Sequence, residues 1–135
     1  MKIIDGKNAV LGRLASYAAK QALLGEEVAV LNCNHVIITG KKTSIERDFD
    51  ESRSRVGSSQ KGPKISRLPD RIVKRTIRGM LPDFRMGRGR IAWKKIKCYA
   101  GVPKEFENKE KITADEHQHT KFVYVSHFKK WNQII

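Results

Sequence analysis

The sequence predicts an α/β domain built on a parallel sheet, and three patterns near its N-terminus support this. A short apolar run at 2–4 precedes a turn at Asp5-Gly6, and a segment with helical periodicity begins at Leu11. A second, β-rich apolar run follows at 28–32. A strand, a helix and a strand in this order form a βαβ unit, which implies a parallel sheet with a right-handed crossover.

The first helix and the strands after it have clear sequence signals. Gly25 is placed to end the helix, whose apolar positions recur at the spacing of a single helical face: Leu11, Leu14, Ala15, Ala18, Ala19 and Ala22. The runs VAVLN (28–32) and HVIITG (35–40) are continuously apolar, which is typical of strands covered on both faces.

A second helix is expected from Thr43, where the residues TSIE fit a capping box that pairs the Thr43 hydroxyl and the Glu46 carboxylate with free amides. Ile45, Phe49 and Val56 would form its buried stripe. Residues 52–69 are rich in Ser, Gly, Pro and cations and lack periodicity, which predicts a loop that is mobile until a partner holds it.

The segment DRIVKRTIRGMLP (70–82) predicts an amphipathic helix with Asp70 as its N-cap and Gly79 as its C-terminal stop. One face is mostly apolar: Ile72, Val73, Thr76, Ile77 and Met80. The other is a row of cations: Arg71, Lys74, Arg75 and Arg78. No acidic residue after Asp70 offers these cations a partner at helical spacing, and like charges at that spacing repel. A solvated charged face is the alternative, but contact with a polyanion is favoured.

The remaining segments complete one domain over 1–135. A Gly- and Arg-rich loop is expected at 84–95, a strand covered on both faces at 96–101, and a polar insertion at 105–120. FVYV (122–125) is a final strand or extended segment, and the C-terminal residues form a short amphipathic helix.

Charge is concentrated in the middle of the chain. The 135 residues carry a formal net charge of +14, yet residues 1–51 and 105–135 are each neutral. Residues 52–104 hold 16 basic side chains against Asp70 and Asp83 alone. Such a concentration opposes folding unless a polyanion compensates it. With no spanning helix and no signal peptide, the expected location is the cytosol and the expected partner is nucleic acid.

Motifs that would indicate a small-molecule site or a metal are imperfect. GKKTS (40–44) lacks the first Gly and the Ser or Thr of a P-loop, which leaves a backbone-phosphate contact at Lys41 and Lys42, or a solvated turn. GRGRIA (87–92) spells GxGxxA without the preceding first strand that a dinucleotide site needs. The acidic and histidine residues of 115–119 are more typical of a solvated loop than of a metal site.

Other side chains give no positive sign of catalysis. Cys33 and Cys98 belong to no CxxC pair and are interpreted as small buried hydrophobes in a reducing compartment. His127 has no evident partner. Neither a cofactor, a metal nor a catalytic residue is predicted, although an RNA-modifying or nucleotide-dependent enzyme and a DNA-compacting protein remain alternatives. The helix and zinc motifs of DNA-binding proteins and the aromatic strand motif of single-strand RNA-binding domains are missing, and basic loops on a neutral body favour a folded RNA. Phe84 is a stacking candidate, whereas Trp93 and Tyr99 are expected in the core.

The motifs IRGMLP (77–82), GR (87–88) and KCYAG (97–101) resemble the signature region of the large-subunit ribosomal protein family numbered thirteen. Earlier stretches are similar too: IDG (4–6), LGRLAS (11–16), VLN (30–32) and ITG (38–40). The resemblance covers residues 3–101, and residues 105–135 match no pattern of the family. A start close to the first strand and the segment KRTIRGMLP resemble archaeal-type members.

The resemblance implies a three-layer α/β/α domain on a four-stranded, mainly parallel sheet with basic loop extensions. It also implies a structural protein of the large ribosomal subunit, in the cytoplasm, that binds large-subunit ribosomal RNA, contacts neighbouring ribosomal proteins and enters assembly early. The RNA-facing region is expected at 52–95, with two further lysines at 41–42. The candidate RNA-binding residues are Lys41, Lys42, Lys61, Lys64, Arg67, Arg71, Lys74, Arg75, Arg78, Arg85, Arg88, Arg90, Lys94 and Lys95.

Overall fold

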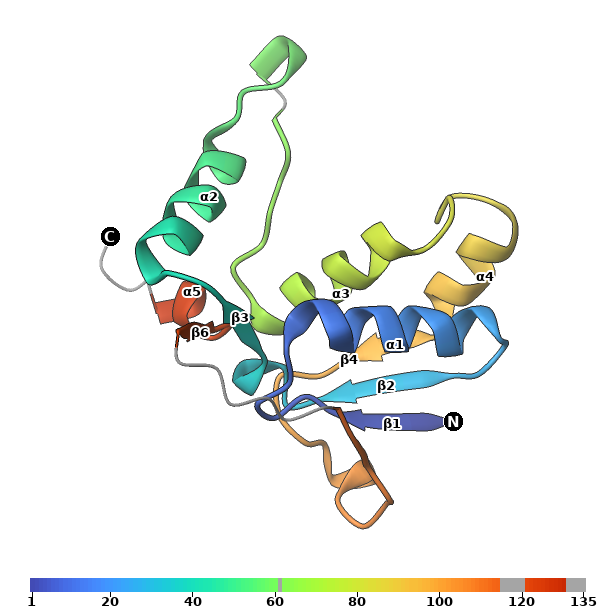
Figure 1. The fold of residues 1–135 in the computed structure, drawn as a ribbon. Helices are drawn as coiled ribbons and strands as arrows, with labels where there is room; N and C mark the ends of the chain where they lie inside the picture. The colour runs from blue at the N-terminus through green and yellow to red at the C-terminus, as the bar shows by residue number, and fades with distance from the viewer. Residues whose placement is uncertain (61, 115–120, 131–135) are drawn as a thin grey trace.

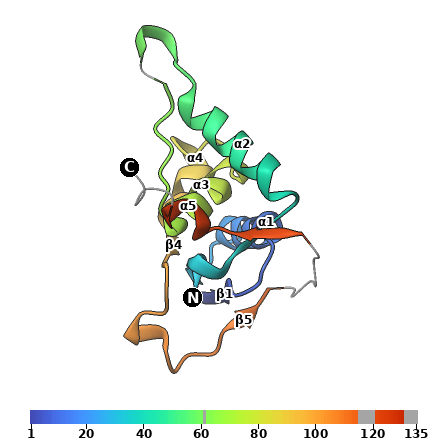
Figure 2. The same cartoon turned by 90° about the vertical axis from the view of Figure 1, so that its left-hand side faces the viewer.

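The computed structural model describes residues 1–60, 62–114 and 121–130. Four parallel strands form the main sheet in the order β4-β2-β1-β5 (Figures 1 and 2). Their bounds are Lys2–Asp5 for β1, Val28–Leu31 for β2, Ile96–Cys98 for β4 and Ile112–Thr113 for β5. This confirms the predicted α/β class with a four-stranded parallel sheet.

Alternate residues of the central strands face two different clusters. Ile4, Val30 and Ile96 belong to the larger core cluster under helix α1 (Leu11–Leu23) and helix α3 (Pro69–Met80). Ile3 and Leu31 face the opposite side, where they pack with Phe106. Phe106 lies on the short 3-10 helix η3 (Lys104–Phe106), which covers this second face. Helices on one side and η3 on the other are consistent with three layers.

Helix α1 forms as its periodicity predicts. Its alanines are buried, which lets α1 approach both the sheet and α3 closely. Gly25 follows the helix with a φ of +97°, a conformation that glycine adopts at no steric cost. The β1-α1-β2 unit is therefore confirmed as a parallel βαβ unit.

A second, two-stranded sheet lies beside the first. Strand β3 (Ile37–Thr39) pairs antiparallel with β6 (Phe122–Tyr124), so the prediction of a strand at 122–125 is confirmed. Strand β3 is not covered on both faces as expected, because Ile38 is half-buried and Thr39 is exposed. Strand β4 also differs: it forms an edge of the main sheet, and Lys97 is exposed.

Helix α2 (Lys42–Ser54) projects away from the sheets as an arm (Figures 1 and 2). It begins one residue before the expected capping box, and no side chain caps it. The Glu46 carboxylate instead pairs with His127 of helix α5 (His127–Lys130) at 2.6 Å. Phe49 stacks on Phe128 at 4.1 Å between ring centroids, but Val56 is 72% exposed and is no part of a buried stripe.

Three segments of the second half differ from the prediction. Helix α4 (Gly87–Lys94) occupies most of the expected Gly- and Arg-rich loop. The predicted polar insertion contains β5, a strand that pairs with β1 through Ile112 and Thr113. Residues 52–54 extend α2, and the 3-10 helix η2 (Ser58–Gln60) follows. No helix in the described ranges has both the length and the apolar character needed to span a membrane.

Gly89 allows α4 to pack against the turn that precedes it. A Cβ atom at this position would lie closer to the carbonyl oxygens of Pro82 and Asp83 than any van der Waals contact permits. We expect Gly89→Ala to lower the free energy of unfolding by about 1–3 kcal/mol, because backbone atoms must move to admit the methyl group.

Gly79→Ala is the matched control, since it adds the same methyl group within α3, where no atom other than the helix's own backbone and the neighbouring residues lies within 4 Å. Alanine exceeds glycine in helix propensity by up to about 1 kcal/mol, so this variant should be as stable as the parent or more so. Urea unfolding of both variants measures the difference. Equal stability of the two would contradict the packing role of Gly89.

Candidate nucleic-acid interface

Helix α3 separates an apolar face from a cationic one, as predicted. Val73 and Ile77 are buried against the core, whereas Arg71 and Arg75 are exposed. The helix begins with Pro69, after Leu68 as its cap, so Asp70 is not the N-cap. The fixed φ of proline suits the first helical position, and Asp70 still complements the dipole in the first turn.

The C-terminal end of α3 also differs from the prediction. Gly79 lies inside the helix, which continues to Met80 and is capped by Leu81. Met80 is exposed rather than part of the buried face, and its sulfur accepts a hydrogen bond from the Ser16 hydroxyl of α1 at 3.4 Å. The cationic face is therefore complete through Arg78, while the apolar face narrows before the helix ends.

Aromatic rings hold part of the cationic row in place. The Arg78 guanidinium lies 4.7 Å from the centroid of Phe84, and the Arg85 guanidinium lies 5.4 Å from the same ring. The Lys74 ammonium lies 4.9 Å from the centroid of Trp93. Such cation–π contacts restrict the long side chains without neutralising their charge. Phe84 therefore orders guanidiniums in this structure, so it is a weaker candidate for base stacking than the sequence indicated.

Helix α4 places three of the candidate cations on a helix rather than on a loop. Arg88, Arg90 and Lys94 are all exposed there. Lys95 caps the helix, and its ammonium donates a hydrogen bond to the Gly25 carbonyl at 2.9 Å. That bond ties the end of α4 to the turn after α1, so Lys95 has a structural contact in addition to its predicted RNA contact.

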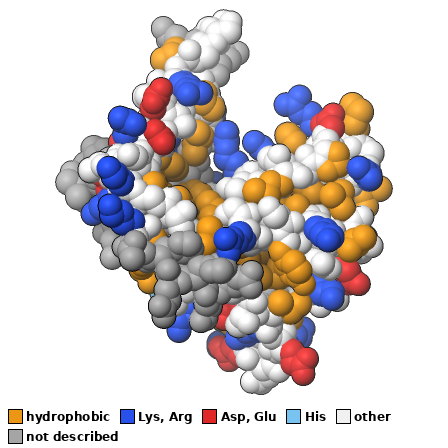
Figure 3. Space-filling view, in the orientation of Figure 1, with side chains coloured by type: hydrophobic (Ala, Val, Ile, Leu, Met, Phe, Trp, Pro, Cys, Tyr) orange, Lys and Arg blue, Asp and Glu red, His pale blue; other side chains and the backbone are white. Residues whose placement is uncertain are grey.

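The cationic faces have few acidic neighbours. Among the described residues, no side chain of α3 or α4 forms an ion pair with a carboxylate, and the pairs of Arg47, Arg55 and His127 lie elsewhere. Figure 3 shows Lys and Arg side chains on both sides of the hollow between the α2 arm and the helices of the body. An uncompensated positive surface of this kind is the electrostatic footprint of a nucleic-acid-binding protein.

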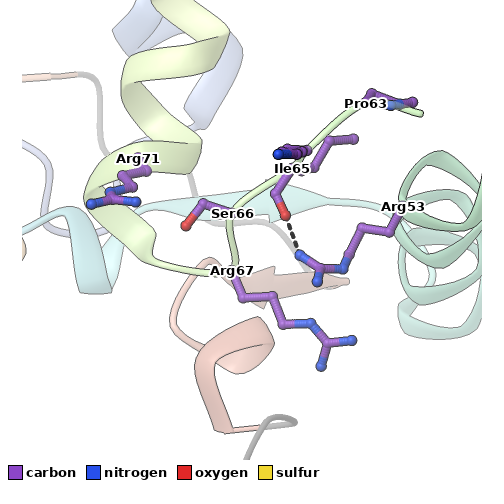
Figure 4. Close-up of a pocket in the computed structure, with 7 residues that line it drawn as sticks. Arg53, Pro63, Ile65, Ser66, Arg67 and Arg71 are labelled. Atoms are coloured by element: carbon purple, nitrogen blue, oxygen red, sulfur yellow. Dashed lines mark hydrogen bonds between the residues drawn. The ribbon is translucent and has the colours of Figure 1, made fainter. Parts of the chain in front are cut away.

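A pocket of about 540 Å³ lies where the arm meets α3. Its lining includes the side chains of Lys64, Arg67 and Arg71, with Arg53 from α2 on the other side (Figure 4). The Arg53 guanidinium donates a hydrogen bond to the Ile65 carbonyl, which joins α2 to the irregular segment that leads back to α3. The guanidiniums of such a pocket can bind phosphate groups bidentately, and the Lys64 ammonium adds a further positive charge.

Arg53 was missed by the sequence analysis. It lies in a stretch assigned to a mobile loop, and only the approach of residues 63–67 to α2 gives it a role. Its sequence signal was weak: one more cation at the start of the basic region. Lys61, in contrast, is a candidate that lies outside the described residues.

The other candidate sites are now placed as well. Lys41 and Lys42 are exposed at the start of α2 and line a pocket of their own with Lys121. The described residues contain no cluster of three or more potential metal ligands, and residues 115–119 lie outside them.

Cys33 and Cys98 are free thiols. A hydrogen bond with Cys98 and burial raise the pKa of the Cys33 thiol, so it stays protonated and packs as an apolar group.

Comparison with known proteins identifies the family of the chain. A family model described as "Ribosomal protein L13" matches residues 1–105. The chain belongs to the ribosomal protein L13 family. The match includes α3, α4 and the arm, so the whole predicted basic region lies within the part that defines the family.

Individual relatives agree with the family match. The protein named large ribosomal subunit protein uL13 of Methanosarcina barkeri is 46% identical over 114 residues, which cover 84% of this chain and 80% of that protein. Its namesake in Methanocaldococcus jannaschii is 45% identical, with 84% of each chain covered. The Archaeoglobus fulgidus protein is 43% identical over 80% of this chain and 68% of its own length. The predicted resemblance to archaeal members of the L13 family is confirmed.

Proposed function

We propose that this chain is a single-domain structural constituent of the large ribosomal subunit that binds large-subunit ribosomal RNA and acts early in subunit assembly. It works in cytoplasmic ribosomes beside neighbouring ribosomal proteins, and the proposal gives it no catalytic step, cofactor or small-molecule substrate. The observation that carries the proposal is the row of cations on α3, which has no acidic partners among the described residues. The chain that presents this row belongs to the ribosomal protein L13 family.

The mechanism is neutralisation of phosphate charge combined with docking of the protein onto an RNA surface of matching shape. The α3 row and the α4 cations offer positive charge to phosphates on one side, and the arm pocket, which shares Arg71 with the α3 row, adds three more cations: Arg53, Lys64 and Arg67. RNA segments that repel one another can then pack against the same protein. Because Phe84 and Trp93 already restrict the side chains of Arg78 and Lys74, less side-chain entropy is lost on binding.

The salt dependence of RNA affinity tests this mechanism. For a surface that neutralises roughly six phosphates, counterion release predicts an affinity loss of about 10³-fold between 50 and 200 mM salt. The measurement is a titration of the chain into fluorescent fragments of large-subunit ribosomal RNA at several salt concentrations. Affinity that stays flat over this range contradicts the proposal, and equal affinity for duplex DNA contradicts its preference for folded RNA.

A further inference from the structure

The small β3–β6 sheet exposes an aromatic surface that lies apart from the cationic row of α3. Alternation along β6 directs Val123 into the core, where it is 6% exposed, and leaves Phe122 41% and Tyr124 39% exposed. Two large rings on the outer face of one short strand are a costly arrangement in water, since each leaves apolar area unburied. Such a surface favours a partner that covers it.

Ring contacts fix the orientation of this aromatic surface. Phe122 and Tyr124 meet edge to face with 5.3 Å between their centroids. The exposed His35 ring meets Tyr124 at 90° and 6.2 Å. The Tyr124 hydroxyl also donates a hydrogen bond to the Asn8 side-chain oxygen at 3.4 Å. The rings are therefore ordered before any partner arrives.

Three lysines adjoin the rings. A pocket of about 370 Å³ is lined by Lys41 and Lys42 at the start of α2. On its other side lie Phe122, the first residue of β6, and Lys121, which precedes it. The Gly40 amide donates a hydrogen bond to the Lys121 carbonyl at 3.0 Å, which holds the two sides of the pocket together. No acidic residue occurs among the described residues that line it. Glu46, further along α2, is engaged by His127.

We propose that this surface binds an unpaired RNA nucleotide, with its base stacked on Phe122 or Tyr124 and its phosphate held by Lys41, Lys42 and Lys121. Aromatic rings beside a positive groove are the combination that single-stranded nucleic acids bind, because every base has a π-face and every nucleotide carries a phosphate. Three ammonium groups around the pocket match a phosphate by charge and give an apolar protein segment no such match. The inference rests on the proposed function and adds a second, separate RNA contact to it.

The test uses the full chain and a short single-stranded RNA that carries the fluorescent base 2-aminopurine. Phe122→Leu and Tyr124→Leu keep apolar bulk but remove the π-face, and the variant that removes the stacking ring should weaken binding roughly tenfold and reduce the quenching of 2-aminopurine. Phe122→Tyr keeps a ring and should retain both affinity and quenching. Lys121→Ala should lower the salt slope of binding by about one. Leu24→Ala, which removes an exposed apolar side chain at the end of α1, is the matched control and should change neither readout.

The outcomes separate this inference from the proposed function. Arg75→Glu with Arg78→Glu should reduce binding of folded ribosomal RNA fragments while leaving the quenching of 2-aminopurine in place. Unchanged quenching in both leucine variants overturns the nucleotide site even if folded RNA still binds through α3. The leucine variants can also be reconstituted into large subunits. If those particles lose a neighbouring ribosomal protein while the affinity of the variants for single-stranded RNA is unaltered, the nucleotide site is overturned and the surface is assigned to a protein partner. If the leucine variants melt near the temperature of the parent protein, they are folded, and any loss of binding is due to the loss of the exposed ring.

Discussion

Replacing Arg75 and Arg78 by glutamate is expected to reduce affinity for large-subunit ribosomal RNA fragments by on the order of 100-fold or more. Each charge-assisted hydrogen bond to a phosphate contributes about 1.5–3 kcal/mol, and two such bonds are replaced by repulsion. Arg75 is exposed and Arg78 lies on the ring of Phe84, so neither side chain belongs to the buried face of α3. The variant should therefore melt close to the temperature of the parent protein.

The matched control reverses two arginines elsewhere. Arg13 and Arg47 are exposed on α1 and α2, so Arg13→Glu with Arg47→Glu changes the net charge by the same amount. Titration with RNA fragments and co-sedimentation with large subunits measure both variants. If the control loses as much affinity as the α3 variant, net charge alone drives binding and the α3 row has no special role.

The parts of the fold that were predictable depend on local signals. Strand β1, helix α1 and strand β2 each carry their own apolar pattern, and Gly25 supplies the stop between them. Strand β5 has no such pattern, because two residues, Ile112 and Thr113, are held in the sheet by pairing with β1. Its position depends on the partner strand, which a scan along the sequence does not contain.

Helix α4 and the start of α2 were missed for tertiary reasons. Two glycines at 87 and 89 lower helix propensity and made 84–95 resemble a loop, yet Gly89 is what lets α4 pack against the carbonyls of the preceding turn. Glu46 fitted a capping box locally, but His127, far along the chain, pairs with it instead. Helix α4 therefore depends on a close approach to the turn before it, and the start of α2 depends on a contact with a residue far along the chain.

The candidate interface also has a part that the sequence predicts and parts that it does not. The α3 row was predictable because a charge repeat on one helix needs only the period of that helix. The arm pocket and the β3–β6 surface were not, because each joins residues distant in sequence: Arg53 with residues 63–67, and Lys41 with Lys121. Only some cations of these two surfaces were therefore predicted, each on its own, whereas Arg53, Lys121 and the exposed rings of β6 were missed.

Ile77→Asp is expected to unfold the protein, because it places a carboxylate on the buried face of α3. Ile77 is 0% exposed and lies in a cluster made of apolar side chains such as Leu14, Val73 and Ile96. Truncating a buried isoleucine costs about 2–5 kcal/mol, and an unpaired carboxylate in such a site adds several more. A domain with the usual stability of about 5–15 kcal/mol retains little after that loss.

Far-UV circular dichroism and urea unfolding measure this effect, with Ile77→Val as the matched control. The valine keeps the apolar contact and should cost only about 0.5–1.5 kcal/mol. A cooperative melt of Ile77→Asp at the parent temperature would contradict the assignment of Ile77 to the core. Arg78 is its neighbour in sequence but lies on the cationic face, so Arg78→Glu should stay folded and lose RNA affinity. Two adjacent residues of α3 would then have separate roles: Ile77 stabilises the fold, and Arg78 contacts the RNA.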